Sequence, residues 1–165
     1  MLFLEMNKRQ HLLYILFMPL LLCLCITAVA CHPYTQYDEY RHTDASGWDR
    51  DSILTFDVPA IEQDGTYIEE LNIRTDNNYP FRQLSLTVDQ QILPSGKHLI
   101  DTLQIDVYDD EGDASGKGFS IFQNQLVFKF ISLHKGDSLH INVSHNMRRH
   151  SISGINDVGI RLEQR

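Results

Sequence analysis

Apolar and polar residues alternate along seven short segments between residues 54 and 162. The alternation has a period of two, which is typical of a strand with one buried face. No segment repeats apolar residues over three helical turns. Turn sequences such as Asp64-Gly65 and Ser153-Gly154 separate the segments. The pattern therefore predicts strands at 54–58, 71–73, 84–88, 103–107, 126–130, 139–143 and 158–162.

Short strands joined by polar turns favour an all-β fold, a single antiparallel β-sandwich of about seven to eight strands. The segment 119–125 fits either one helical turn or an eighth strand. We expect the sandwich to span 51–165. The preceding segment, 31–50, is polar and aromatic without a sustained period, so we expect a tether that reaches the domain near Trp48.

Residues 1–30 have the pattern of a lipoprotein signal peptide. A basic pair, Lys8-Arg9, precedes an apolar stretch, and the small residues Ala28 and Ala30 stand directly before Cys31. A retained transmembrane helix is the alternative, but such an anchor does not need small residues at these positions. We therefore predict that the signal is removed and that Cys31 becomes the lipidated N-terminus.

Charge and cysteine content narrow the class of protein further. From Cys31 onward the chain has 12 basic and 21 acidic residues, and this acidity disfavours binding to nucleic acid or to anionic lipid surfaces. Membrane attachment must then come from the acyl chains. Cys23 and Cys25 lie in the signal, so no disulfide or thiolate metal site is expected.

Two groups of residues raise the question of a metal site. Asp109, Glu111 and Asp113 place carboxylates on a Gly-rich loop, which suits calcium, but their spacing is not that of an EF-hand. We prefer the interpretation of a solvated acidic turn. Four histidines fall between 134 and 150, yet no pair of ligands is expected to converge. No metal and no cofactor is therefore predicted.

Catalytic motifs are missing from the sequence. It contains no Gly-x-Ser-x-Gly and no His-Glu-x-x-His, and its length leaves little room for a glycosidase cleft. We therefore predict that the protein is not an enzyme.

The C-terminal stretch carries a run of residues that resembles the end of the GldH family of gliding-motility lipoproteins. This run includes His145-Asn146-Met147-Arg148 and continues through 154–163. Further matches occur in order along the chain: Gly47-Trp48-Asp49-Arg50-Asp51, then Arg74 with Asn77-Asn78-Tyr79-Pro80-Phe81, and Asp101-Thr102-Leu103. Family members often carry a tryptophan in the Gly-rich loop where this chain has Ala114, so no aromatic role transfers there.

The resemblance implies a lipoprotein of the envelope machinery for gliding and its linked protein secretion. Its expected partners are other envelope lipoproteins or membrane proteins of that assembly. No acidic run resembling a surface-export signal follows Cys31, which favours an outer-membrane anchor facing the periplasm. The candidate interaction surface comprises Trp48, Tyr79, His145, Met147, Arg148, Asp157 and Arg161.

Two alternatives stay open for these residues and for the fold. The first is that they determine the fold, with Trp48 and Tyr79 in the core and Arg148 paired to Asp157. The second is that the sandwich binds a glycan or another small ligand through exposed aromatics such as Tyr67, Tyr79 and Tyr108. An exposed apolar patch near 154–159 would instead indicate a protein partner.

Overall fold

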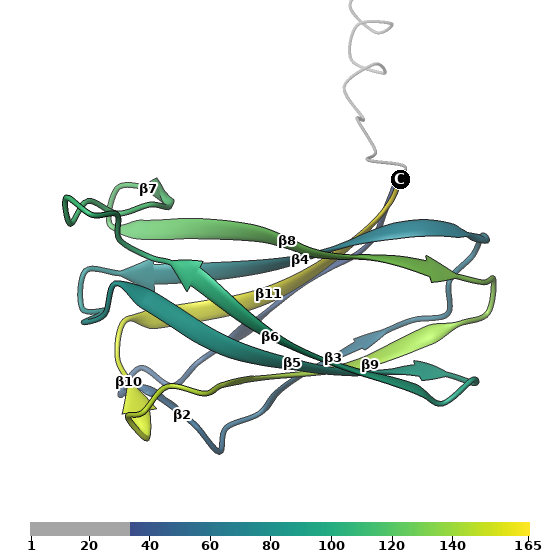
Figure 1. Cartoon of the computed structure of the whole chain (residues 1–165), viewed down its shortest axis with the longest axis horizontal. Helices are drawn as coiled ribbons and strands as arrows, with labels where there is room; N and C mark the ends of the chain where they lie inside the picture. Colours follow the sequence, from purple (N-terminus) through teal and green to yellow (C-terminus); the bar gives the residue numbers. More distant parts are fainter. Residues whose placement is uncertain (1–33) are drawn as a thin grey trace, which may run out of the picture. The chain divides into compact units, whose positions relative to one another are not determined.

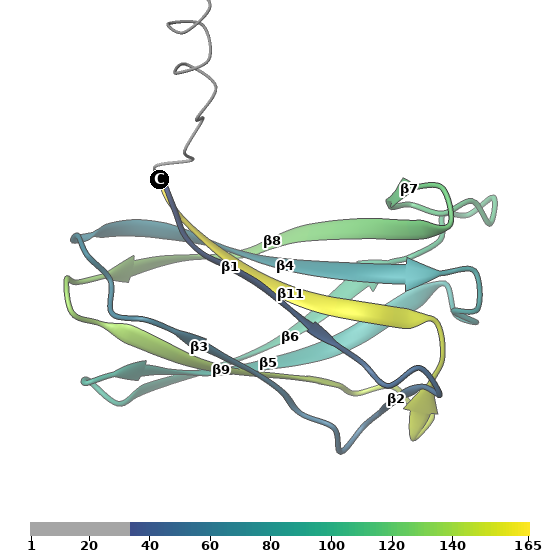
Figure 2. The same cartoon turned by 180° about the vertical axis from the view of Figure 1, so that it is seen from behind.

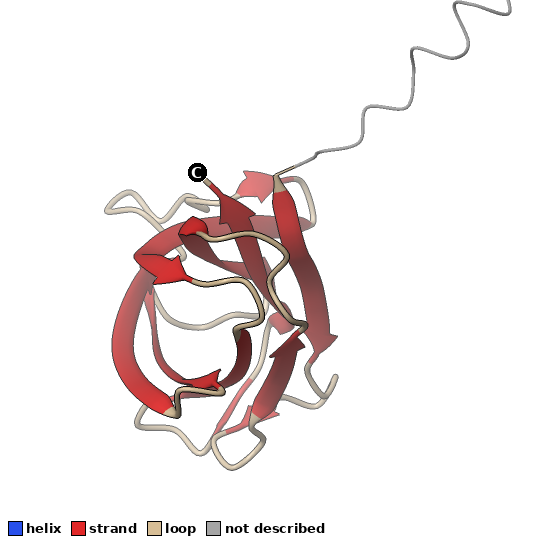
Figure 3. Cartoon of the chain, turned by 90° about the vertical axis from the view of Figure 1, so that its right-hand side faces the viewer, coloured by secondary structure: helices blue, strands red, loops and turns tan. Residues whose placement is uncertain are grey.

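The computed structural model describes residues 34–165. This part of the chain consists of strands and loops and contains no helix (Figure 3). No helix that could cross a membrane was found there. The strands are β1 (Thr35–His42), β2 (Trp48–Asp49), β3 (Leu54–Val58), β4 (Gly65–Asp76), β5 (Gln83–Leu93), β6 (Lys97–Asp106), β7 (Lys117–Gly118), β8 (Ile121–Leu133), β9 (Ser138–His145), β10 (Ser151–Ile152) and β11 (Ile155–Gln164).

Two antiparallel sheets lie face to face, as Figure 1 shows. The first sheet has five strands in the order β1-β11-β4-β8-β7, and the second has four in the order β3-β9-β5-β6. A short ladder joins β10 to β2. The prediction of an all-β antiparallel sandwich is confirmed.

The core lies between the two sheets, because alternate residues of each strand face inward. In β5 the inward residues include Leu84, Leu86 and Val88, all fully buried, and Ile141 and Val143 of the neighbouring strand β9 lie beside them on the same inward face. Six of the seven segments predicted from alternation fall within a strand of the structure, and the seventh, 103–107, ends one residue beyond β6. Apart from β3, which has the predicted bounds, those strands are longer than predicted, because polar residues at their ends also join the ladders.

The segment expected to be a tether differs from that expectation between residues 35 and 49. Thr35–His42 forms β1, which pairs along its length with β11 and closes one edge of the five-stranded sheet (Figure 2). Only Tyr37 of this strand is buried, so the strand shows no alternation of apolar residues. The uncertain segment 119–125 is resolved as well: its residues from Ile121 onward belong to β8.

The two sheets leave one side of the sandwich open. There β6 is the last strand of its sheet, and β8 is flanked by β7 only at Phe122 and Gln123. Lys129 of β8 and Asp101 of β6 form an ion pair across this opening. The open side therefore presents two strand edges next to each other.

Candidate functional site

Trp48, in β2, and His145, the last residue of β9, form a buried pair. Each side chain is only 1% exposed, and the rings meet edge to face with centroids 5.2 Å apart. The indole N–H donates to the Ser52 carbonyl oxygen (2.7 Å), and His145 Nε2 donates to the Trp48 carbonyl oxygen (3.1 Å). Burial lowers the pKa of His145, which favours its neutral form. These two residues stabilise the fold and do not contribute to an exposed surface.

The loop after β9 is held by Arg50. Its guanidinium donates to the carbonyl oxygens of Met147, Arg148 (2.8 Å) and Arg149 (3.3 Å). The Met147 sulfur accepts from the Ser85 N–H (3.4 Å), and its side chain packs against the core. Arg148 keeps its side chain exposed. Of these predicted residues, Arg148 is therefore the one available to a partner.

Tyr79 is buried where two loops meet. It is 3% exposed, its hydroxyl donates to the Gln83 carbonyl oxygen (2.8 Å), and burial raises its pKa. Gly154 approaches so closely that a Cβ there would lie 2.1 Å from the Tyr79 backbone nitrogen. This glycine also has a φ of +77°, a conformation that other residues rarely adopt. The Gly154–Tyr79 contact thus fixes the two loops against each other.

Asp157 does not pair with Arg148, so the Arg148–Asp157 ion pair considered from the sequence is wrong. Asp157 is 6% exposed and contacts His42 and Arg74, whose guanidinium nitrogen lies 3.6 Å away. Asp157 lies near the start of β11, which runs between β1 and β4 in the five-stranded sheet. Arg161 lies further along β11 and pairs with Glu163 at 3.0 Å.

The candidate metal residues are engaged in local contacts. Asp109 Oδ1 accepts the backbone N–H groups of Glu111 (3.1 Å) and Asp113 (2.8 Å), which closes the acidic turn. His140 pairs with Asp57 at 2.6 Å and His134 with Asp137 at 3.7 Å. In residues 34–165 no three metal-binding side chains come together.

The three tyrosines expected for a glycan site do not form a solvent-facing row. Tyr67 is fully buried, with its hydroxyl donating to the Gln63 carbonyl oxygen (2.7 Å), and Tyr79 is nearly so. Tyr108 is partly buried and stacks on Tyr79, with ring centroids 6.5 Å apart. The segment 154–159 also lacks an exposed apolar patch, because β11 lies between β1 and β4.

Exposed apolar side chains occur instead on the strands and the loop that border the open side of the sandwich. Phe119 is 95% exposed, Phe130 is 60% exposed, and Ile121 and Val127 are about half exposed along the same stretch. Ile100 is 61% exposed on the facing edge strand β6. We call these five residues the open-side patch. Sequence reasoning missed this patch, although the apolar residues between 119 and 130 were its visible signal.

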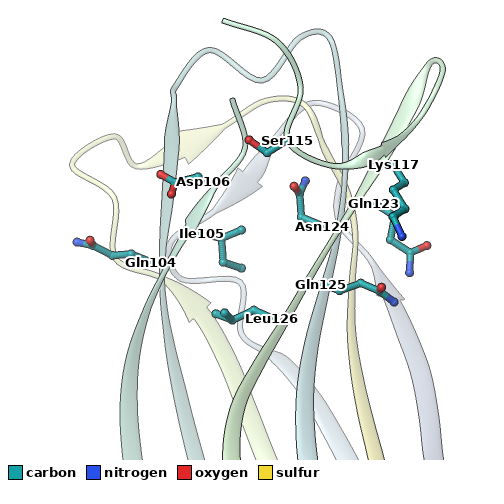
Figure 4. Close-up of a pocket in the computed structure, with 9 residues that line it drawn as sticks. All are labelled: Gln104, Ile105, Asp106, Ser115, Lys117, Gln123, Asn124, Gln125 and Leu126. Carbon is teal, nitrogen blue, oxygen red and sulfur yellow. The ribbon is translucent and has the colours of Figure 1, made fainter. Parts of the chain in front are cut away.

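A cleft of about 380 Å³ lies beside the open-side patch, between β6 and β8 (Figure 4). Amide side chains are frequent in its lining, and an acid, a lysine and a serine stand at its rim. The lining residues are Gln104, Ile105, Asp106, Ser115, Lys117, Gln123, Asn124, Gln125 and Leu126.

A buried carboxyl lies deeper in the sandwich. Glu69 of β4 is fully buried and accepts from Gln90 Nε2 of β5, in the facing sheet, at 3.1 Å. Burial raises its pKa to about 7, an effect that exceeds the opposing hydrogen bond from Gln90 and the nearby charge of Lys129. Glu69 does not line the cleft. It therefore bridges the two sheets out of reach of a substrate there.

The two packed sheets of residues 34–165, with their buried aromatic clusters and their open side, define an all-β sandwich domain. The family model of the GldH lipoprotein matches residues 35–162. The chain belongs to the GldH lipoprotein family, and the resemblance found in the sequence is confirmed.

Curated relatives match over most of their length. The gliding motility lipoprotein GldH of Flavobacterium johnsoniae is 32% identical over 154 residues, covering 88% of this chain and 95% of that one. The gliding motility lipoprotein GldH homolog of Christiangramia forsetii is 28% identical and covers 82% of this chain and 87% of that one. Among solved structures, the Eiger TNF of S. frugiperda aligns over 80% of this chain and 93% of its own, with 12% identity and a TM-score of 0.35, too low to support any argument.

Proposed function

We propose that this protein is a lipid-anchored, non-enzymatic component of the gliding-motility and secretion assembly of the cell envelope, and that it acts by binding other proteins of that assembly. The observation that carries the proposal is the open-side patch, whose exposed apolar side chains belong to β6, to β8 and to the loop before β8, the elements that border the open side. Exposed apolar side chains beside open strand edges are uncommon on monomeric proteins and often mark surfaces that bind another protein. The names of the curated relatives, both gliding motility lipoproteins, support the cellular role.

The geometry also favours this role over that of a hydrolase. A hydrolase would need a titratable group with a shifted pKa in an accessible cleft. The carboxyl with the strongly raised pKa, Glu69, is fully buried and bonded to Gln90. A binding role therefore accounts for the surface better than a catalytic one.

The predicted anchor, Cys31, lies outside the described residues, three positions before Tyr34. Three residues span at most about 10 Å, so a lipid on Cys31 would hold the Tyr34 end of the sandwich near the membrane. The Tyr34 carbonyl oxygen accepts from the Gln164 N–H, and Gln164 pairs with Tyr67 of β4. Asn124 in the cleft pairs with Ile73, six residues further along β4, or about 20 Å. This arrangement leaves the cleft end available to periplasmic partners of an outer-membrane lipoprotein.

Affinity purification of the tagged full-length protein from gently solubilised envelopes tests the proposal. Wild type should recover other envelope lipoproteins or membrane proteins, and the mislocalised Cys31→Ala variant should not. The double variant Phe119→Ser/Phe130→Ser should lose the same proteins because it removes both exposed phenylalanine rings of the patch.

The matched control is Ile53→Ser/Leu93→Ser, which removes two exposed apolar side chains elsewhere on the surface. This control should retain the partners. Equal recovery with both double variants would refute the role of the open side. Recovery of bound glycan without any protein would favour the ligand-binding alternative.

A further inference from the structure

The cleft between β6 and β8 has an apolar floor and polar walls. Ile105 and Leu126 point into it from opposite strands, whereas Gln104 and Gln125 turn outward on either side (Figure 4). At the rim, Lys117 and Asp106 carry opposite charges. A ligand that fits these groups combines an apolar body with hydrogen-bonding groups and has little net charge.

Asn124 gives the cleft an unused hydrogen-bond donor. Its side chain is 6% exposed and points into the cleft, and Nδ2 has no hydrogen-bond partner among residues 34–165. Gly116, in the loop before β7, packs closely against this side chain: a Cβ added at Gly116 would lie 2.9 Å from Nδ2. Buried donors are rarely left unpaired in native proteins, so this one calls for an acceptor that residues 34–165 do not supply.

The backbone beside Asn124 is also free to pair. From Asn124 to Val127, β8 pairs with β4 on one side and with no strand on the other, and Phe128 is the extra residue of a bulge. The Lys129–Asp101 ion pair closes the opening beyond this stretch. Four residues of strand extend about 13 Å, and an unpaired edge of this kind is a template for an added strand.

We propose that this cleft binds an extended peptide segment of a protein partner, which adds as a strand along β8 and accepts a hydrogen bond from Asn124 Nδ2 through a backbone carbonyl. The proposal rests on the protein-binding function and names its recognition site. Peptide backbone supplies the alternating donors and acceptors that a free edge and amide side chains require. Exposed Val127 on the same free stretch of β8 can contact an apolar side chain of the peptide. A glycan fits less well, because no aromatic ring lines the cleft.

Site-specific photo-crosslinking in living cells tests the proposal. A photoreactive phenylalanine derivative is placed at Lys117 on the rim of the cleft in the full-length lipoprotein. The control position is Gln91, an exposed residue of β5 that does not line the cleft. Lys117 should crosslink to one defined segment of a partner protein, which mass spectrometry identifies, and Gln91 should not.

Affinity measurements with a synthetic peptide of the crosslinked segment then test the binding mode. Asn124→Leu in the full-length protein should weaken the affinity about tenfold, whereas Gln91→Leu should leave it unchanged. The same peptide with N-methylated backbone amides should lose binding to wild type, because strand addition uses those N–H groups. This second measurement does not depend on the folding of any variant.

The outcomes separate this proposal from the protein-binding function. If Lys117 gives no crosslink while affinity purification from the same cells still recovers partners, the cleft is not the site and the protein-binding function stands. If purification also recovers nothing, the protein-binding function itself is wrong. Unchanged affinity of the N-methylated peptide, or a crosslink to carbohydrate, overturns strand addition.

Discussion

Glu69 is the residue for which pH matters most. Its pKa is raised to about 7 by burial, whereas in the unfolded chain it has the ordinary value of a glutamate. The folded state thus binds more protons than the unfolded state between about pH 4.5 and 7, so the contribution of Glu69 to stability falls as pH rises through this window. The difference corresponds to about 3 kcal/mol at most.

We expect Glu69→Gln to remove this dependence and to be more stable than wild type at pH 8. Urea unfolding at pH 5 and pH 8 measures the effect. Glu62→Gln, at an exposed position, is the matched control and should follow wild type at both values. If the urea midpoints of wild type and Glu69→Gln differ by the same amount at pH 5 and pH 8, Glu69 is not the source of the pH dependence.

A substitution at Gly154 tests how closely its loop packs against the loop that carries Tyr79. Gly154→Ala must adopt a left-handed φ and also places its Cβ against the Tyr79 backbone. Gly96 has a similar φ of +71° but open space around it, so Gly96→Ala carries the conformational cost alone, about 1 kcal/mol. We expect Gly154→Ala to cost at least about 2 kcal/mol more in the free energy of unfolding. Equal urea midpoints for the two variants would show that the loops can move apart.

At the scale of an element, β1 is part of the sheet and carries a testable consequence. It covers the edge of β11, whose residues Val158, Ile160 and Leu162 are buried. A chain that starts at Thr43 should therefore fold poorly or aggregate through the exposed β11 edge, whereas one that starts at Tyr34 should fold. Hydrogen exchange and size-exclusion chromatography of both chains measure this. If residues 31–50 act only as a tether, the two chains will be equally well folded.

The elements that sequence could predict are those with a regular inward face. Alternation in β5 and β9 locates both strands because Leu84, Leu86, Ile141 and Val143 all enter the core. β1 escapes this test, since Tyr37 is its single buried side chain. The pattern also gives no pairing order, so it could not show that β6 and β8 would become neighbouring edges.

The candidate site was difficult to predict for the same physical reason. Asn124 stands between Gln123 and Gln125, and three consecutive amides suggest a solvated strand. Only the inward direction of Asn124 in the ladder with β4 makes it a buried donor. Trp48, Tyr79 and His145 were found from sequence through the family pattern, but their burial depends on loops that meet only in the folded chain.

At the scale of the whole molecule, the net charge and the lipid anchor have opposite effects on membrane attachment. The chain from Cys31 onward carries 21 acidic and 12 basic residues, so anionic headgroups repel it. Attachment to a bilayer then depends on the acyl chains alone, and an acylated N-terminus with more than one chain anchors stably. We therefore expect Cys31→Ser to abolish membrane association and to leave the folded sandwich unchanged.

Flotation with vesicles of anionic phospholipid at low salt is the most demanding test of this prediction, because low salt strengthens any electrostatic attraction between protein and lipid. Wild type purified from membranes should float, and Cys31→Ser should stay at the bottom of the gradient. Matching circular dichroism spectra of the two proteins would exclude unfolding as the cause. Flotation of Cys31→Ser would mean that the sandwich itself binds lipid. The open-side patch would then be the first surface to test, because exposed apolar side chains can enter a bilayer as well as contact a protein.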